Sequence, residues 1–158
     1  MKHYLFDLDD TLYMNPSKKS EMYDITPDDI LINLLNNCPH PKYIYTNAMY
    51  IHANLILNKL EMQEIFKKIY SRDTIPLMKP EYNSAVDIEK NIIITGNTKN
   101  NKFVFFDDLL PNLKTGKKKG WVTIWISPLY RNKKHYEYID HAFPDIKTAL
   151  FHCNEHDI

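Results

Sequence analysis

The sequence begins with a cluster of acidic side chains directly after a short apolar run. In the segment LFDLDDTLY, Asp7, Asp9 and Asp10 fall within four positions. Like charges this close repel one another, and an ionised carboxylate beside an apolar wall is costly unless positive charge lies among the acids. We therefore expect a cation, a basic side chain or shared protons at this place.

Polar residues also follow two other apolar runs. Thr46 and Asn47 come directly after the run YIY, and Asp107 and Asp108 end the run FVFFDD. Lys79 stands at the start of a stretch with a helical pattern. In an open parallel sheet, ligands bind outside the carboxyl ends of the strands. We therefore expect these residues to converge with the N-terminal acids on one site.

These residue types suit the transfer of a phosphoryl group through a carboxylate. Asp7 can attack phosphorus and form an aspartyl-phosphate, which divides one difficult displacement into two easier ones. Asp9 can protonate the leaving oxygen and then take a proton from the attacking water. The hydroxyl of Thr46 and the ammonium of Lys79 would hold the phosphate oxygens as charge builds on them.

The acids provide hard oxygen ligands for Mg²⁺. Asp107 and Asp108 would bind the cation together with Asp7, which cancels the repulsion between Asp7 and the dianion it attacks. A calcium-binding loop that starts at Asp7 is excluded, because its required glycine and glutamate would fall on Leu12 and Lys18.

Three of these residues also have simpler interpretations. Thr46 could cap the end of a strand, and Lys79 could be a surface residue. Asn47 could cap the next helix rather than turn its amide toward a substrate. The acids, the hydroxyl and the lysine occur together and in order, which favours the site.

Short apolar runs alternate with helical patterns, which is typical of an α/β protein with a mainly parallel sheet of about five strands. The expected strands are 3–6, 43–45, one within 64–73, 102–108 and 121–127. The expected helices are 26–37, 48–60, 79–92, 109–120 and a terminal helix from 144, with 130–135 as a loop. These elements must bring the polar residues together.

The helix expectations include end and face assignments. The first helix is expected to have Thr26 as its N-cap, and the helix 109–120 is expected to end at Gly120. We expect the four lysines of that helix to lie on a solvated face rather than to bind nucleic acid. The expected buried faces consist of Ile30, Leu31, Leu34 and Leu35 in the first helix, and of Ile51, Leu55, Ile56 and Leu60 in the second.

Composition limits the class of protein. A chain of 158 residues with 44% hydrophobic content predicts one domain, 1–158. Lys plus Arg equals Asp plus Glu at 20 each, so no global charge draws the protein to a membrane, while a local patch leaves nucleic acid open as a partner. No signal pattern and no membrane-spanning apolar run is present, so a soluble, cytoplasmic protein is expected.

The segments DLDDTLY, YIYTN, MKP and FVFFDD, in this order, resemble the four motifs of the haloacid dehalogenase (HAD) superfamily of Mg²⁺-dependent phosphohydrolases. The resemblance implies a three-layer, Rossmann-like core. It implies Asp7 as nucleophile, Asp9 as acid and base, Thr46 as phosphate-binding hydroxyl, Lys79 as the lysine of the third motif and Asp107 as metal ligand.

The resemblance also extends to finer features. Asp108 matches the second acid of the metal motif, and in this family the backbone carbonyl at the position of Asp9 binds the metal. The segments TNAMYIHANLILNKL, KPEYNSAV and DDLLPNLKTGKKKGW are similar to those of pyrimidine 5′-nucleotidase-like members. This implies a nucleotide or another small phosphate ester as substrate. His52 matches a histidine of these members, and a packing role on a helix face stays open.

The short intervals between the motifs depart from the pattern of the family. Members that act on small metabolites usually carry a cap domain, but core elements take up the intervals between these motifs, so we expect a capless protein. An uncapped site favours a phosphorylated macromolecule, a protein or a nucleic-acid end. A further alternative is a non-catalytic binding module, which the intact set of site residues disfavours. A dehalogenase is disfavoured because its chemistry needs neither Asp9 nor a metal.

Overall fold

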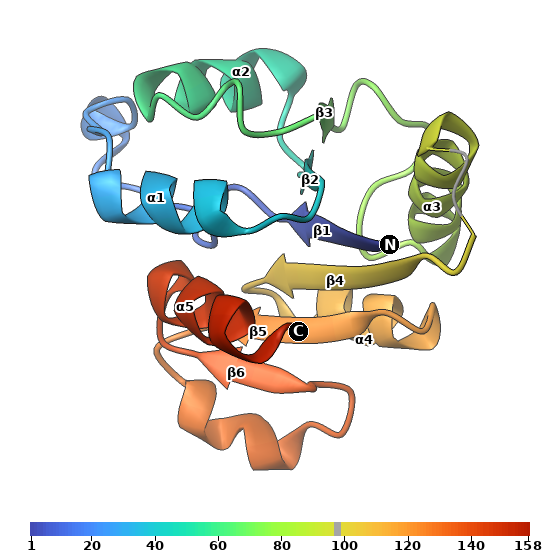
Figure 1. Cartoon of the computed structure of the whole chain (residues 1–158). Helices are drawn as coiled ribbons and strands as arrows, with labels where there is room; N and C mark the ends of the chain where they lie inside the picture. Colours follow the sequence, from blue (N-terminus) through green and yellow to red (C-terminus); the bar gives the residue numbers. More distant parts are fainter. Residues whose placement is uncertain (97–98) are drawn as a thin grey trace.

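Six parallel strands form one sheet in the computed structural model, which describes residues 1–96 and 99–158 (Figure 1). The strand order is β3-β2-β1-β4-β5-β6, and every neighbouring pair is parallel. The strands are β1 (Lys2–Phe6), β2 (Lys42–Tyr45), β3 (Lys68–Tyr70), β4 (Lys102–Asp107), β5 (Val122–Ile126) and β6 (His141–Phe143). The five expected strands are confirmed, and β6 adds a sixth at the edge.

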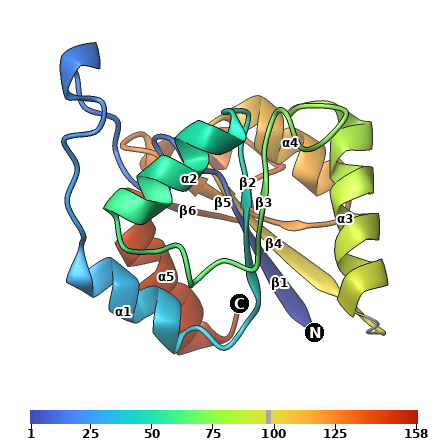
Figure 2. The same cartoon turned by 90° about the horizontal axis from the view of Figure 1, so that it is seen from above.

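Helices cover both faces of the sheet, so the protein has three layers (Figure 2). One face carries α1 (Asp29–Asn37), α2 (Tyr50–Lys59) and α5 (Ile146–His156), and the other carries α3 (Tyr82–Gly96) and α4 (Leu110–Lys118). Two short 3₁₀ helices, η1 (Lys19–Glu21) and η2 (Tyr130–His135), complete the described elements. The expected α/β class with a Rossmann-like core is confirmed.

The sheet buries apolar side chains on both faces, because successive residues of a strand point to opposite sides. On the face of α1, α2 and α5, the rings of Phe6 and Phe106 stack at 4.5 Å. On the other face, Leu5 and Phe105 pack with Trp121. The central strands therefore have no solvated face, and Asp7, Thr46 and Asp107 at the ends of β1, β2 and β4 are among the few buried polar residues.

The strand order reverses at β1, which lies between β2 and β4. The register pairs Phe6 with Phe106, and the backbone N–H of Asp7 donates to the Phe106 carbonyl at 2.9 Å. The carboxyl ends of β1 and β4 therefore lie side by side. In open α/β sheets, this kind of switch point is where ligands bind.

The first helix begins later than the sequence predicts. Its N-cap is Asp28, which accepts a hydrogen bond from the Leu31 N–H at 3.1 Å, so the prediction of Thr26 is wrong. Asp28 also accepts from Lys147 of α5 at 2.8 Å, a contact that local sequence does not reveal. Ile30 is 63% exposed, and the buried face consists of Leu31 and Leu35.

Other expectations also need correction. Ile51 is 78% exposed and Leu55 lies at the surface, because α2 turns Ala53, Ile56 and Leu57 toward the core. Lys79 lies in the loop before α3 instead of opening that helix, and residues 130–135 form η2 instead of a loop. The helix α4 ends at Lys118 with Lys119 as its C-cap, so the predicted C-cap, Gly120, is one residue too late. Gly120 follows the cap with the positive φ of 88° that favours glycine after a helix.

The two cysteines, Cys38 and Cys153, are buried free thiols. Among the helices that the structure describes, none is both long and apolar enough to cross a membrane.

The corrected face of α1 can be tested with adjacent residues. We expect Leu31→Ala to lower the free energy of unfolding by about 2–5 kcal/mol, because it leaves a cavity in the core. Ile30→Ala should change it by less than about 0.5 kcal/mol, because that side chain is solvated. Urea denaturation of both variants measures the difference. Equal losses would contradict the orientation of the helix.

Candidate active site

A buried lysine joins the acids of two neighbouring strands. The Lys79 Nζ donates to Asp7 Oδ1 at 2.8 Å and to Asp107 Oδ2 at 2.7 Å. It also lies 5.0 Å from the ring centre of Tyr45 and 5.6 Å from that of Phe105. Burial opposes the charged ammonium, but Asp107 and Asp7 outweigh that effect and raise the pKa of Lys79. The lysine is therefore positively charged at neutral pH.

The loop of Lys79 is fixed by Asn47, which follows β2. The Asn47 Nδ2 donates to the Lys79 carbonyl at 3.0 Å, and the Lys79 N–H donates to Asn47 Oδ1 at 3.0 Å. Both polar atoms of the amide are thus engaged with the backbone of the lysine. Asn47 therefore positions the loop of Lys79. The two roles expected from the sequence were contact with a substrate and capping of the next helix.

Thr46 lies at the end of β2, where its hydroxyl accepts a hydrogen bond from the Ala48 N–H at 3.0 Å. The hydroxyl hydrogen is not used in that bond. Thr46 lines a pocket of about 250 Å³ together with Asp7, Asp9 and Lys79. The local capping role and a role toward a ligand in this pocket are therefore compatible.

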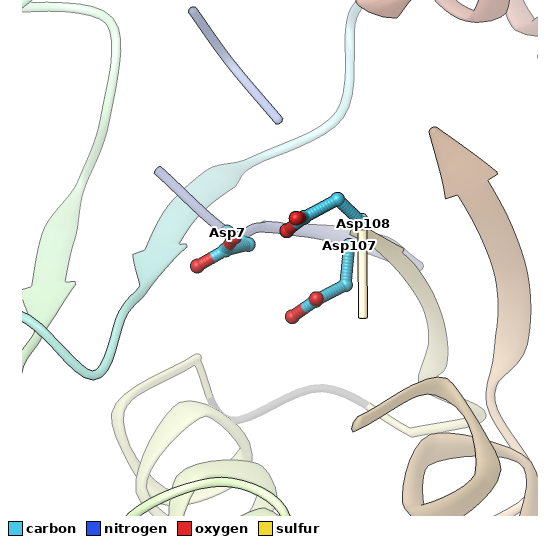
Figure 3. A group of neighbouring side chains, drawn as sticks. All are labelled: Asp7, Asp107 and Asp108. Carbon is cyan, nitrogen blue, oxygen red and sulfur yellow. The ribbon is translucent and has the colours of Figure 1, made fainter. Parts of the chain in front are cut away.

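Three carboxylates gather at the carboxyl ends of β1 and β4 (Figure 3). Asp7, Asp107 and Asp108 each place one oxygen within 4.8 Å of the others. The Thr11 hydroxyl lies 3.1 Å from Asp7 Oδ2 and 3.2 Å from Asp108 Oδ1, so it can donate to either. Several hard oxygens at this spacing fit a divalent cation such as Mg²⁺ or Ca²⁺.

Asp107 is the most enclosed of these acids. Its Oδ1 accepts from the Leu109 N–H at 2.8 Å, and the Asn112 amide of α4 lies within 3.2 Å of both oxygens. Lys79 takes the remaining position on Oδ2. The residue after Asp107 is Asp108, and its backbone carbonyl accepts a hydrogen bond from the indole of Trp125 at 3.0 Å. This contact holds the turn after β4.

Burial changes the acidity of two of the acids. Desolvation raises the pKa of Asp107 to about 6, with Lys79 opposing the rise and Asp7 adding to it. Desolvation and the charges of Asp107 and Asp7 raise the pKa of Asp108 to about 7. A single lysine therefore does not neutralise the cluster, and a bound cation would favour the ionised acids.

Asp9 lies beside the cluster and has its own partners. Its Oδ1 accepts from the Tyr13 hydroxyl at 2.5 Å and pairs with His52 Nε2 at 2.9 Å. The His52 Nδ1 lies 3.2 Å from the Tyr23 hydroxyl, so a neutral His52 that donates to Asp9 can accept from Tyr23. His52 therefore orients Asp9 and is not merely a packing residue of α2. The carboxylate of Asp9 is not part of the three-acid group.

The neighbouring acid, Asp10, shapes the turn after β1. It has a positive φ of 61° and accepts a hydrogen bond from the Asn15 N–H at 3.0 Å.

The structure brings the predicted site residues together and adds several that the sequence analysis missed. Thr11 stands inside the first motif and could have been found there, as a hydroxyl beside three acids. Asn112 is a polar residue in the first turn of α4, and the residue that follows it, Leu113, is buried. Tyr13 and Trp125 gave no local signal, because their polar atoms find partners only in the folded chain.

Comparisons with known proteins agree with this fold. No protein-family model matches the chain, and no curated protein sequence matches it significantly. A haloacid dehalogenase-like family hydrolase from Streptococcus pneumoniae has a TM-score of 0.67 and 14% identity, over 95% of this chain and 96% of that one. YfnB from Bacillus subtilis, described as a HAD-hydrolase and bound to magnesium, has a TM-score of 0.69 and 14% identity, over 98% of both chains.

Two further structures show the chemical range of these neighbours. CbbY from Rhodobacter sphaeroides, in complex with phosphate, has a TM-score of 0.63 and 13% identity, over 90% of this chain and 93% of that one. The L-2-haloacid dehalogenase from Xanthobacter autotrophicus has a TM-score of 0.62 and 14% identity, over 84% of this chain and 63% of that one. The fold is that of HAD-like hydrolases. At these identities, the likeness concerns the fold.

The raised pKa values predict how the cation-free protein responds to pH. Asp107 and Asp108 have pKa values above the ordinary 3.8, so these two carboxyls bind more protons in the folded state than in the unfolded state. Their contribution to the unfolding free energy should then fall as pH rises from about 4 to 7, while the lowered pKa values of His3, His40 and His141 act in the opposite direction. Chemical denaturation in EDTA measures the sum, and an added divalent cation should reduce the carboxyl contribution.

Asp108→Asn provides the control, because it keeps the size of the side chain and removes one titrating group. Between about pH 4 and 7, its unfolding free energy should rise relative to that of the wild type, because the contribution of Asp108 is absent. An identical pH dependence in the wild type and the variant would contradict the raised pKa of Asp108.

Proposed function

We propose that this protein is a Mg²⁺-dependent phosphatase that hydrolyses phosphate monoesters through an aspartyl-phosphate on Asp7. The observation that carries the proposal is the shared position of Lys79 between Asp7 and Asp107, beside Thr46 and Asp9 in one pocket. The fold likeness to the HAD-hydrolase YfnB, solved with magnesium, and to CbbY, solved with phosphate, supports it.

In the first step, an oxygen of Asp7 attacks phosphorus and the bond between phosphorus and the leaving oxygen breaks. Asp9 gives its proton to that oxygen, so the product leaves as an alcohol. His52 and Tyr13 hold the Oδ1 of Asp9, which leaves Oδ2 for the proton transfer. The Lys79 ammonium and the Thr46 hydroxyl stabilise the charge on the phosphate oxygens.

In the second step, water attacks phosphorus and Asp9 takes the proton of the water. The bond between phosphorus and the Asp7 oxygen breaks, which releases inorganic phosphate and restores the carboxylate. Asp9 thus ends the cycle with the proton that it began with. Its partners fix one oxygen throughout, so the same residue can serve as acid and then as base.

The Mg²⁺ site would use the carboxylates of Asp7, Asp107 and Asp108 together with the backbone carbonyl of Asp9. When bound, the cation supplies positive charge that lets a carboxylate approach the phosphate dianion. Asp107 holds Lys79 through its Oδ2, so it contributes to both halves of the site.

The phosphatase chemistry is favoured over dehalogenation, although dehalogenases occur among the similar structures. A halide leaves without a proton, so its displacement needs no acid, whereas an alcohol leaving group does. The oriented Asp9 and the acid group Asp7, Asp107 and Asp108 serve phosphoryl transfer.

We further propose that the chain acts as one capless domain. Between β1 and α1 the chain forms the single short turn η1, and between β2 and β3 it forms α2. A nucleotide or another small phosphate ester can reach this site, and so can the phosphorylated end of a macromolecule.

A generic aryl phosphate tests the reaction class. We expect its hydrolysis with Mg²⁺ and no measurable turnover in excess EDTA. Ca²⁺ should inhibit, because its longer and looser coordination misplaces Asp7 relative to phosphorus. A colorimetric assay of phosphate release measures this turnover. Undiminished turnover in EDTA would contradict the assignment of a metal to the site.

Substitutions separate the roles of the two aspartates. Asp7→Asn should reduce turnover to background, because no aspartyl-phosphate can form. Asp9→Asn should slow alkyl esters by roughly 10²- to 10⁴-fold, as is typical for loss of acid-base catalysis. Its first step should be slowed less for nitrophenyl esters, which need little protonation.

Single-turnover burst kinetics with both kinds of ester measure this difference. If Asp9→Asn slows the burst equally for good and poor leaving groups, Asp9 is not the general acid.

A further inference from the structure

A second pocket opens beside the proposed catalytic pocket. It has a volume of about 340 Å³, and the two pockets share Asp9 in their linings. Its wall comes from the segment between β1 and α1 on one side and from α2 on the other. The polar residues of its lining include Asn15, Lys18, Lys19 and His52. Asp9 therefore stands at the junction of the two pockets.

The charge of this second pocket is opposite to that of the first. The catalytic pocket contains four acids and a single lysine. The second pocket, by contrast, is lined by one acid, Asp9, and by two lysines, Lys18 and Lys19. Two positively charged side chains therefore lie beside the acidic site, next to Asp9, the proposed proton donor to the leaving group.

The two lysines are available to a ligand. The Lys18 Nζ lies 3.9 Å from Glu21 Oε1, and these side chains are 74% and 48% exposed, so the pair contributes little. Lys19 forms no ion pair with any residue in the described part of the chain. Lys18 has only this loose, exposed contact with Glu21, so both ammonium groups can contact an anionic group.

The proposed role of Asp9 as general acid indicates which part of the substrate occupies this second pocket. A general acid must lie within hydrogen-bond reach of the leaving oxygen, so the leaving group lies next to Asp9. The pocket that shares Asp9 is the space beside that oxygen. The rest of the leaving group then extends toward Lys18 and Lys19.

We propose that this second pocket binds an additional anionic group, a phosphate or a carboxylate, on the leaving group of the substrate. The preferred substrates are then small bisphosphates or phosphorylated acids. This inference rests on the proposed phosphatase activity. It makes Lys18 and Lys19 specificity-determining residues that take no part in the chemical step.

A series of matched esters tests the proposal. Each n-alkyl phosphate of three to six carbons is compared with the α,ω-alkanediol bisphosphate of the same length. We expect kcat/KM to be about 5- to 30-fold higher for the bisphosphate at the best length, as one charge-assisted contact allows. The preference should peak at one length, because the lysines lie at a fixed place, and it should shrink as salt is added.

The double variant Lys18→Ala/Lys19→Ala should reduce kcat/KM of the bisphosphates to about twice that of the monoesters, which is the factor that two equivalent phosphates give. Its turnover of an aryl phosphate should stay within about twofold of the wild type, since the lysines are outside the catalytic pocket. The matched control is Lys90→Ala/Lys102→Ala, which removes the same charge from exposed residues outside both pockets. That control should retain the preference.

The second anion can belong to a small bisphosphate or to the end of a nucleic acid. A 5′-phosphorylated dinucleotide, whose leaving group carries a phosphodiester, distinguishes these two sources. Turnover that depends on both lysines and exceeds that of the alkanediol series would assign the anion to a nucleic-acid end. Turnover below that series would assign it to a small bisphosphate.

The outcomes separate this inference from the proposed function. Equal kcat/KM within every pair, with the aryl phosphate still hydrolysed, would overturn the anion pocket and leave the phosphatase intact. Hydrolysis of no ester would contradict the phosphatase itself. Calorimetric binding of the same pairs to Asp7→Asn would then decide about the pocket, and equal affinities within each pair would overturn it.

Discussion

The ammonium of Lys79, held between the carboxylates of Asp7 and Asp107, is the interaction on which the rest of the site depends. Removal of one partner from a buried ion pair commonly costs about 3–5 kcal/mol, because it leaves an uncompensated charge. The fold supplies the pair from three places: the end of β1, the end of β4 and the loop before α3. Asn47 clamps that loop from the end of β2, so four separate segments must be in place together.

A constraint of charge follows from this pair. One lysine cannot neutralise Asp7, Asp107 and Asp108, and burial makes the excess charge costly, which is why the pKa values of Asp107 and Asp108 rise. A site with too few positive charges of its own suits a cation. The basic wall at Lys18 and Lys19 lies on the other side of Asp9, where a leaving group would lie. The proposed phosphatase uses both kinds of charge.

The sequence predicts the site better than it predicts the edges of the fold. Asp7, Thr46 and Asp107 each follow an apolar run, so a parallel sheet was enough to bring them together. Thr26 failed as an N-cap and Ile30 as a core residue because contacts between distant elements, such as Lys147 with Asp28, decide the start and rotation of a helix. The pairing of Asn47 with the backbone of Lys79 is equally invisible in local sequence, since the two residues are 32 positions apart and α2 and β3 lie between them.

The identity of the nucleophile is the central claim of the proposed mechanism. The most direct measurement is rapid acid quenching of Asp9→Asn during turnover of a nitrophenyl phosphate, followed by mass spectrometry of the peptide that contains Asp7. The mechanism predicts a phosphoryl group on Asp7, because the variant lacks the base that activates water for the second step. A phosphoryl group on another carboxylate such as Asp108, or turnover with Asp7 never modified, would contradict it.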